Sequence, residues 1–268
     1  MSAEPTLETE YATLTPLQVR IDTHQRYSEH PDDPDTAVLN ALALTGTEVL
    51  ADIGCGTARF LARLATGGHS GQLIGVDQSP AMVAAARAVN GVHAIQADAS
   101  RLGFDDGELD VLTARHMLYH LPEPIAALAE FRRVTRPGGT VAVVVNHART
   151  CWRTHDLVAS HARNHGIAPV TDLINDNVTS DTLPDMMHDT FGTATVQSYD
   201  NALLFREPGP LIAFAEALFV FCGITADHPA RSDILAELIA DIERWFADHP
   251  GQAWRDPKGY TVATSITR

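Results

Sequence analysis

The sequence predicts an α/β fold, in which a largely parallel β-sheet carries helices on both faces. Between residues 48 and 146, short apolar runs alternate with longer helical stretches, which is typical of strands joined by helical crossovers. The chain has 268 residues, 45% of them hydrophobic, and is therefore long enough to bury such a core as one domain.

Each element of this region has its own signal. The helix expected at 35–44 is apolar-periodic, with Asp35 as a candidate N-cap. The helix at 79–89 is rich in alanine, and the strand at 140–146 is rich in valine. The helix at 123–135 repeats apolar residues at helical spacing. The remaining strands are expected at 48–53, 72–76, 92–96 and 109–114, and the remaining helix at 57–66.

The flanking parts of the chain are less regular. Residues 1–34 are polar and indicate a short helical extension, whereas residues 166–192 are turn-rich and predict no clear element. Helices are expected at 154–165, 210–221 and 233–247, and strands at 193–205 and 258–267.

Composition argues against several classes of protein. The net charge of −15 opposes binding to a phosphate backbone, so we expect no nucleic-acid partner. No apolar run approaches the roughly 20 residues that span a bilayer, and Met1–Glu10 lacks the pattern of a secretory signal. We therefore expect a cytoplasmic protein without a membrane partner. The three cysteines lie far apart, and the pairs His116/His120 and His161/His165 have no third ligand at motif spacing, so neither disulfides nor a metal are expected.

The strongest chemical signal is the segment VLADIGCGTARF at residues 49–60. A buried strand ends near the acid Asp52, and a loop with Gly54 and Gly56 then opens a helix. Glycine permits tight turns and lets a ligand approach the backbone closely. A helix N-terminus also presents unpaired N–H groups. The segment therefore predicts a ligand-binding loop.

Two further acids follow the next two strands. Asp77 stands 77 − 56 = 21 residues after Gly56, close to the roughly 20 expected for a ribose-binding carboxylate. Alternatively, Asp77 caps the helix that follows it. Asp98 comes directly after the third strand, where a carboxylate can accept the adenine amino group or can serve as an ordinary turn residue.

Five segments, taken in order, resemble the class I S-adenosylmethionine-dependent methyltransferases, and in particular the ubiquinone-biosynthesis-like branch that acts on small molecules. These segments are VLADIGCGTARF, GVDQSP, QADAS, ELDVLTARHMLYHLPEP and RPGGTVAVVV. The resemblance covers residues 35–148 and extends more weakly to residue 268. It implies a Rossmann-like, doubly wound sheet of seven mostly parallel strands with an antiparallel final strand. It also implies S-adenosylmethionine as the cofactor, and methyl transfer to an oxygen, nitrogen or carbon of a small-molecule acceptor, with natural-product metabolism as one setting.

The same resemblance organises the chain as a single domain in three parts. Residues 1–34 would form an N-terminal extension or lid, residues 35–148 would bind the cofactor, and residues 149–268 would form the acceptor side. A helical insertion at about 208–250 would precede the last strand. The sequence does not decide whether the protein forms a homodimer.

Roles for individual residues follow from the family's motifs. Asp52 and the two glycines would hold the methionine end of the cofactor, and Asp77 would bind its ribose. The full set of implied cofactor residues is Asp52, Gly54, Cys55, Gly56, Asp77, Gln78, Asp98, Ala99 and Arg115. The segment 136–139, RPGG, would be a structural turn before the fifth strand. One departure from the family pattern is Ala58, which stands where a third glycine is usual.

The acceptor side offers two candidate bases, His120 and His147, which follow the fourth and fifth expected strands. Histidine is the side chain whose ordinary pKa lies nearest neutrality, so it suits proton removal from an acceptor. Alternatively, His120 is a turn residue and His147 a surface residue. Tyr27, His116 and Tyr119 are expected to contact the acceptor.

Other functions remain open at this point. The cofactor could assist a reaction without losing its methyl group, or the domain could sense the cofactor or act as a scaffold without catalysis. A dehydrogenase is less consistent with the sequence, because Arg59 stands where the G-x-G-x-x-G pattern requires its third glycine.

Overall fold

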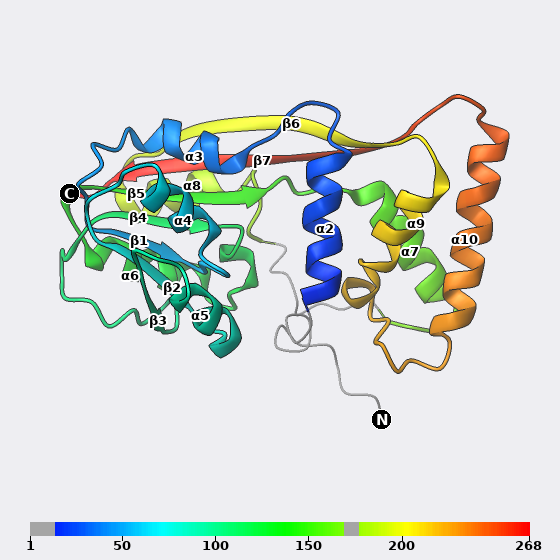
Figure 1. Cartoon of the computed structure of the whole chain (residues 1–268), viewed down its shortest axis with the longest axis horizontal. Helices are drawn as coiled ribbons and strands as arrows, with labels where there is room; N and C mark the ends of the chain where they lie inside the picture. Colours follow the sequence, from blue (N-terminus) through cyan, green and yellow to red (C-terminus); the bar gives the residue numbers. More distant parts are fainter. Residues whose placement is uncertain (1–13, 169–176) are drawn as a thin grey trace. The chain divides into compact units, whose positions relative to one another are not determined.

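A computed structural model gives the fold of residues 14–168 and 177–268 (Figure 1). Contacts between residues divide the chain into two compact units. We call residues 33–148, 177–199 and 260–268 the sheet unit, and residues 14–32, 149–168 and 200–259 the helical unit. The predicted cofactor core at 35–148 falls within the sheet unit.

Seven strands form a sheet in the order β3-β2-β1-β4-β5-β7-β6. The neighbours among β1 to β5 are parallel, and β7 is antiparallel to β5, with Asn146 opposite Tyr260. The predicted α/β class, a mostly parallel sheet with an antiparallel final strand, is therefore confirmed. The strands are β1 (Leu50–Ile53), β2 (Leu73–Asp77), β3 (Val92–Gln96), β4 (Leu109–Arg115), β5 (Thr135–Asn146), β6 (Thr195–Phe205) and β7 (Trp254–Ile266).

Both faces of the central strands are buried, which explains why these strands are apolar runs rather than alternating ones. Ile53, Val76 and Val143 belong to the core that α6 and α8 cover. Leu50 and Val144 belong to a second core, on the side of α3, α4 and α5. The helices of the sheet unit are α3 (Pro34–Leu42), α4 (Arg59–Thr66), α5 (Pro80–Arg87), α6 (Pro124–Val134) and α8 (Leu183–Phe191), with a 3₁₀ turn η1 at Leu118–His120.

The start of α3 differs from the prediction. Asp33, not Asp35, is its N-cap, and the Asp33 carboxylate accepts a hydrogen bond from the Thr36 N–H at 3.2 Å. Pro34 occupies the first helical position, which a proline favours because its ring fixes a helical φ. Asp35 therefore lies inside the first turn, and its carboxylate accepts a hydrogen bond from Arg115 rather than from the helix N-terminus.

Two strands are longer than predicted, and one helix was not predicted. The segment expected as a turn at 136–139 is part of β5, because Gly138 and Gly139 exchange backbone hydrogen bonds with Thr267. β7 begins at Trp254 rather than at residue 258. Helix α8 lies within the stretch that predicted no element.

The helical unit has its own core, built from α7 (Trp152–Asn164), α9 (Pro208–Glu216), α10 (Arg231–Asp248) and a 3₁₀ turn η2 at Phe219–Cys222. The helix expected at 210–221 is thus divided into α9 and η2. Within the N-terminal extension, α2 covers Leu14–Arg26, and residues 1–13 lie outside the described part. In the described part of the chain, no helix has the length and apolar character needed to cross a membrane.

The N-terminus of α7 is capped from a distant strand. Its own N-cap residue, Cys151, makes no side-chain cap. Instead, the fully buried carboxylate of Asp256 on β7 accepts hydrogen bonds from the N–H groups of Arg153 at 3.1 Å and Thr154 at 2.9 Å. Burial raises the pKa of Asp256 above its ordinary value. This contact explains why a charged residue is tolerated inside β7.

Candidate cofactor site

The loop between β1 and α4 is held in an unusual backbone conformation. Gly54, Gly56 and Ala58 have φ values of 68°, 55° and 58°. The N–H groups of Gly54 and Cys55 both bond to the carbonyl of Val76 on β2, at 2.8 and 3.0 Å. The loop therefore turns back over the carboxyl ends of β1 and β2, where ligands bind in open α/β sheets.

The two glycines of this loop are required for different reasons. A Cβ atom on Gly54 would lie 2.7 Å from the Cβ atom of Met117, so this glycine lets the loop pack against the segment after β4. A Cβ atom on Gly56 would meet no atom within 4 Å. Gly56 thus leaves open space beside the backbone, as a cradle for a ligand requires.

Ala58 occupies a left-handed conformation that usually favours glycine. Its side chain is fully buried in the core beneath α4. The departure from the family pattern at this position therefore leaves the loop in the conformation that a glycine would adopt.

Asp77 connects the two loops of the site. One carboxylate oxygen accepts the Gly56 N–H at 2.9 Å, and the other accepts the Ser79 N–H at 2.9 Å. Ser79 itself is the N-cap of α5 and accepts the Met82 N–H. A carboxylate offers about four acceptor positions, so Asp77 retains capacity for two further donors, such as ribose hydroxyls.

Asp98 follows the last residue of β3, Gln96, by two positions. Because β3 pairs with β2, Gln96 lies opposite Asp77. The amide of Gln96 also donates to the carbonyl of Gln78 at 3.0 Å. Hydrogen bonds from the hydroxyl and N–H of Ser100 lower the pKa of Asp98. The Asp98 side chain is exposed and the neighbouring Ala99 is buried.

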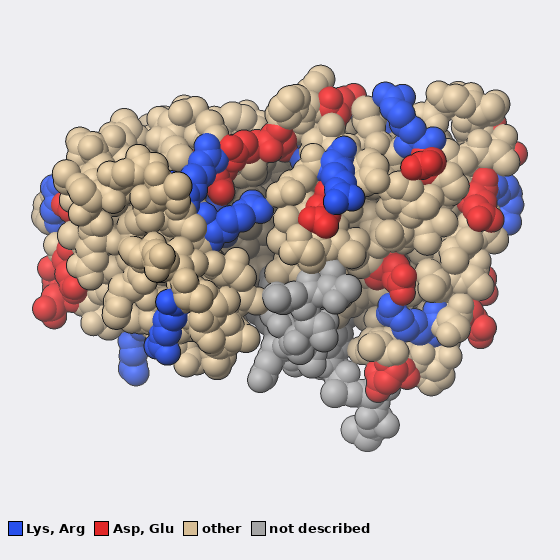
Figure 2. Space-filling model, viewed as in Figure 1, with Lys and Arg blue, Asp and Glu red and all other residues tan. Residues whose placement is uncertain are grey.

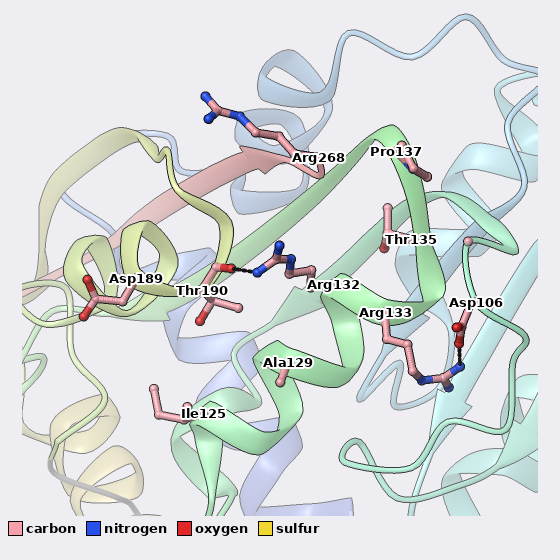
Figure 3. A pocket seen from close by; sticks show the side chains of 11 residues that line it. Asp106, Ile125, Ala129, Arg132, Arg133, Thr135, Pro137, Asp189, Thr190 and Arg268 are labelled. Carbon is pink, nitrogen blue, oxygen red and sulfur yellow. Dashed lines mark hydrogen bonds and ion pairs between the residues drawn. The ribbon is translucent and has the colours of Figure 1, made fainter.

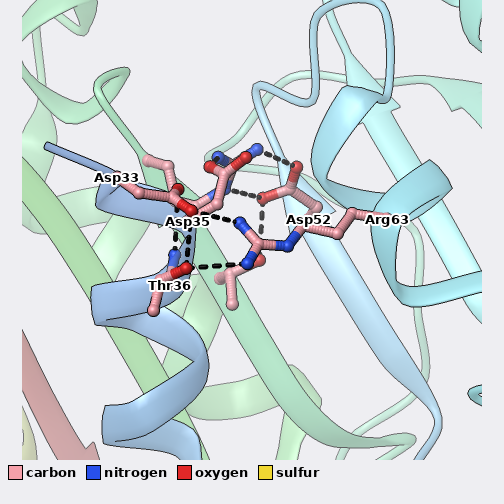
Figure 4. Close-up of polar contacts among 7 residues, drawn as sticks. Asp33, Asp35, Thr36, Asp52 and Arg63 are labelled. Carbon is pink, nitrogen blue, oxygen red and sulfur yellow. Dashed lines mark hydrogen bonds and ion pairs between the residues drawn. The ribbon is translucent and has the colours of Figure 1, made fainter. Parts of the chain in front are cut away.

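The end of β1 is joined to the end of β4 by a buried ion pair (Figure 4). Arg115 donates from Nε and Nη2 to the two oxygens of Asp52, at 3.2 and 2.9 Å, and from Nη1 to Asp35 at 2.6 Å. Thr113 donates to Asp52 at 2.7 Å, and Phe60 stacks under the guanidinium at 4.1 Å. Burial alone would lower the pKa of Arg115, but the attraction of Asp52 outweighs it and the pKa is raised.

Cys55 is part of the loop but is not a reactive thiol. Its side chain is buried against Gly75, where an added Cβ would lie 2.9 Å from the sulfur. Burial raises the pKa of Cys55 to about 12, so the group stays a neutral thiol. Its side chain therefore packs within the loop, and its predicted contact with the cofactor stays a prediction.

The predicted acceptor residues lie in three places. His116, Tyr119 and His120 lie in the segment from the end of β4 through η1, and His147 directly follows β5. Tyr119 is buried, and its hydroxyl accepts the side-chain amide of Asn146 at 3.2 Å. His116 has a positive φ of 53°, and its ring meets that of Tyr260 at 6.3 Å.

Tyr27 belongs to the helical unit. Its ring packs on Phe205 with a centroid distance of 5.4 Å, and its carbonyl accepts the Leu204 N–H. Its predicted contact with the acceptor stays a prediction.

Two residues near the loop were not predicted as site residues. Asp35 belongs to no recognisable binding motif, and it meets Arg115 only in the folded chain. Met117 has no polar group and is recognisable only by its contact with Gly54. Within the described ranges 14–168 and 177–268, no three His, Cys, Asp or Glu side chains are arranged to hold a metal ion.

A groove of about 950 Å³ lies elsewhere on the sheet unit (Figure 3). Ile125, Ala129, Arg132 and Thr190 are among the residues that line it, and Arg132 bonds to the carbonyl of Thr190 at 2.9 Å. None of the predicted cofactor or acceptor residues is among its lining residues. On the face drawn in Figure 2, basic side chains form no continuous patch.

The residues of the loop fit a cationic nucleoside ligand. The site has four carboxylates, and the guanidinium groups that oppose them are those of Arg115, which binds two of them, and of Arg101 beside Asp98. The group of side chains is therefore acidic; its carboxylates are those of Asp35, Asp52, Asp77 and Asp98. Asp77 can accept hydroxyl donors, and Gly56 leaves room for a ligand against the backbone. These features match S-adenosylmethionine, which carries a ribose and a positively charged sulfonium.

The comparison with family models gives the class. Residues 51–143 match the model described as a methyltransferase domain. Residues 51–143 are therefore similar to a methyltransferase domain, and the seven-stranded sheet that contains them has the fold that the sequence motifs indicated.

Two curated relatives match part of the chain. The demethylmenaquinone methyltransferase of Staphylococcus saprophyticus is 38% identical over 102 residues, which is 36% of this chain and 43% of that protein. An uncharacterised 37.1 kDa protein from a Streptomyces fradiae transposon is 36% identical over 113 residues, 40% of this chain and 33% of that protein. The chain thus spans less than half the length of these curated relatives.

Solved structures share the fold over a longer range. A protein from Anabaena variabilis, described as a methyltransferase from an antibiotic biosynthesis pathway, has a TM-score of 0.64 at 18% identity, covering 87% of this chain and 96% of that one. The cyclase SpnF has a TM-score of 0.59 at 19% identity, covering 99% of each chain.

Proposed function

We propose that this protein transfers the methyl group of S-adenosylmethionine to a small-molecule acceptor. The observation that carries the proposal is the position of Asp77, whose carboxylate joins the Gly56 and Ser79 N–H groups beside the open space at Gly56. The names of its relatives, which include methyltransferases of small molecules, support the same activity. The proposal includes a cytoplasmic location, no nucleic-acid or membrane partner and no metal, and it leaves a homodimer open.

In this proposal each part of the site has a task. S-adenosylmethionine supplies an electrophilic methyl group. Asp77 accepts the ribose hydroxyls, Asp98 and the backbone of Ala99 receive the adenine with Gln78 beside it, and the loop from Asp52 to Gly56 receives the methionine end. These contacts orient the cofactor, and orientation with exclusion of water is the main contribution an enzyme makes to such a displacement.

The acceptor end of the reaction needs a base only if the acceptor atom carries a proton that must leave. His120 and His147 are our candidates, because each follows a strand at the carboxyl edge of the sheet. Tyr27, His116 and Tyr119 are our candidates for acceptor contacts. The test replaces His120 and His147 by Gln, one at a time. The variant that loses the base should have a lower kcat with the same cofactor affinity. The other variant should keep the wild-type kcat and cofactor affinity.

Calorimetric titration with S-adenosylmethionine and with its demethylated product tests the proposal. We expect saturable binding of both by the wild type, and a loss of at least about 100-fold for Asp77→Ala, because two charge-assisted hydrogen bonds contribute about 1.5–3 kcal/mol each. Ser79→Ala is the matched control, since it removes the cap of α5 but leaves the Asp77 carboxylate. No binding of either ligand by folded wild-type protein would refute the proposal.

A second candidate function uses the cofactor without methyl loss. SpnF, which shares the fold over nearly the whole chain, is described as a [4+2]-cyclase rather than as a methyltransferase, and this description motivates the alternative. Incubation with S-adenosylmethionine and a panel of acceptors separates the two candidates. Formation of the demethylated product along with methylated acceptor supports methyl transfer, whereas acceptor conversion with the cofactor intact supports the alternative.

A further inference from the structure

The ion pair between β1 and β4 contains more negative than positive charge. Arg115 alone faces two carboxylates, those of Asp52 and Asp35. Two carboxylates and one guanidinium give the cluster a formal net charge of −1.

Asp35 is not needed to neutralise the guanidinium. Asp52 already pairs with Arg115 through two hydrogen bonds, which is the strongest arrangement for this pair of groups. Asp35 takes a separate hydrogen bond from Nη1. It lies in the first turn of α3, where the helix dipole favours a negative charge. Asp35 is therefore a stable surplus charge rather than a required counter-ion.

The surplus charge lies on the accessible side of the cluster. The side chain of Asp52 is 1% exposed, whereas those of Asp35 and Arg115 are 13% and 16% exposed. Among the residues that the structure describes, only one of the two carboxylate oxygens of Asp35 accepts a hydrogen bond. The other oxygen is thus available to a cation.

The cluster also stands at the edge of the sheet that carries the proposed cofactor loop. Arg115 is the last residue of β4, and Asp52 precedes Gly54 by two residues. S-adenosylmethionine and its demethylated product differ at the sulfonium, which is positive in the former and a neutral thioether in the latter. A partly buried negative charge nearby distinguishes the two, because charges interact more strongly there than in bulk water.

We propose that Asp35 is a specificity-determining residue that makes the site prefer S-adenosylmethionine to its demethylated product. This inference rests on the proposed function, since it concerns the same cofactor. The neutral product lacks this attraction, so it is held less tightly than the cofactor that it replaces.

The test is the ratio of the two dissociation constants, measured by calorimetry at one ionic strength. Asp35→Asn removes the charge but keeps an oxygen that can accept from Arg115, and Asp35→Glu keeps the charge. Asp189→Asn is the matched control, because this exposed acid of α8 loses the same charge without touching the cluster. Thermal unfolding of each variant verifies that it is folded.

We expect Asp35→Asn to reduce the preference for S-adenosylmethionine about tenfold, which corresponds to about 1.4 kcal/mol. The ratio should stay within about twofold of wild type for Asp35→Glu and Asp189→Asn. An unchanged ratio in Asp35→Asn, with both ligands still bound, overturns this inference and leaves the proposed function intact. Failure of the wild type to bind either ligand overturns the proposed function itself, and with it the role assigned to Asp35.

Discussion

Alanine substitutions at Gly54 and Gly56 should separate packing from ligand binding within one loop. Both glycines have a positive φ, which costs an alanine about 1–2 kcal/mol. Alanine also reduces the conformational entropy of the unfolded chain, which offsets about 0.4–1 kcal/mol of this cost. Gly56→Ala should therefore lower the free energy of unfolding by between about 0 and about 1.6 kcal/mol, because its new methyl group meets no protein atom. Gly54→Ala should add about 1–3 kcal/mol of overpacking, since its Cβ would lie 2.7 Å from Met117.

The two variants should show the opposite order in cofactor affinity. The methyl group of Gly56→Ala enters the open space of the proposed cradle, so affinity for S-adenosylmethionine should fall at least tenfold. Gly54→Ala should lose less affinity once it is measured at a temperature where the protein is folded. Urea denaturation gives the stabilities and calorimetry gives the affinities.

Gly68→Ala is the matched control, because Gly68 follows α4, has a φ of 90° and would meet no atom within 4 Å. It isolates the backbone cost from packing and from ligand contact. If Gly54→Ala were no less stable than Gly68→Ala, the packing on Met117 would be wrong. If Gly56→Ala bound the cofactor like the wild type, the cradle would not be where the ligand lies.

Three further predictions concern buried groups. Arg115→Ala should cost about 3–5 kcal/mol in urea denaturation, because it leaves its buried carboxylate partner without a counter-charge; a loss below about 1 kcal/mol would contradict this. Because burial raises the pKa of Asp256 above its ordinary 3.8, protonation favours the native state. The stability of the wild type relative to Asp256→Asn should therefore increase as the pH falls from neutral toward 3.8, and a constant or decreasing difference would mean that the helix cap outweighs burial. The thiols of Cys55, Cys151 and Cys222 are buried with raised pKa values, so iodoacetamide at pH 8 should leave the native mass unchanged and add three groups in denaturant.

The strands of the central sheet were predictable because burial on both faces makes each one an apolar run. The strand at 92–96 has its predicted bounds, and those of β1, β2 and β4 differ by two residues or fewer. Helix α8 was missed although Leu183, Met187 and Phe191 follow one another at intervals of four and are all buried. The polar residues between them and the proline in the first turn hide this periodicity in the sequence.

The bounds of β7 show a limit of a different kind. Arg255, Asp256 and Pro257 are unfavourable strand residues, so the strand was expected to start after them. Asp256 is tolerated because it caps α7, about 100 positions earlier in the chain. A local pattern cannot indicate such a contact, since its stabilising partner is distant in sequence.

The candidate site divides in the same way. The loop glycines and Asp77 could be recognised because a strand, a turn and an acid at fixed spacing form a local pattern, and the structure brings Asp77 to Gly56. Asp35, by contrast, was predicted only as the cap of the apolar-periodic helix at 35–44. The structure instead pairs it with Arg115, 80 positions later.

The sequence by itself thus determined the α/β class, the order of the strands along the chain and the acids that follow them, because periodicity and turn chemistry act between residues close in the chain. The tertiary structure alone decided which groups meet: Gly54 with Met117, Arg115 with two carboxylates, and Asp256 with the start of α7. These contacts depend on how strands pair and helices pack. They join residues far apart in the chain, and the hydrogen bonds and close contacts that fix them exist only once the core has formed.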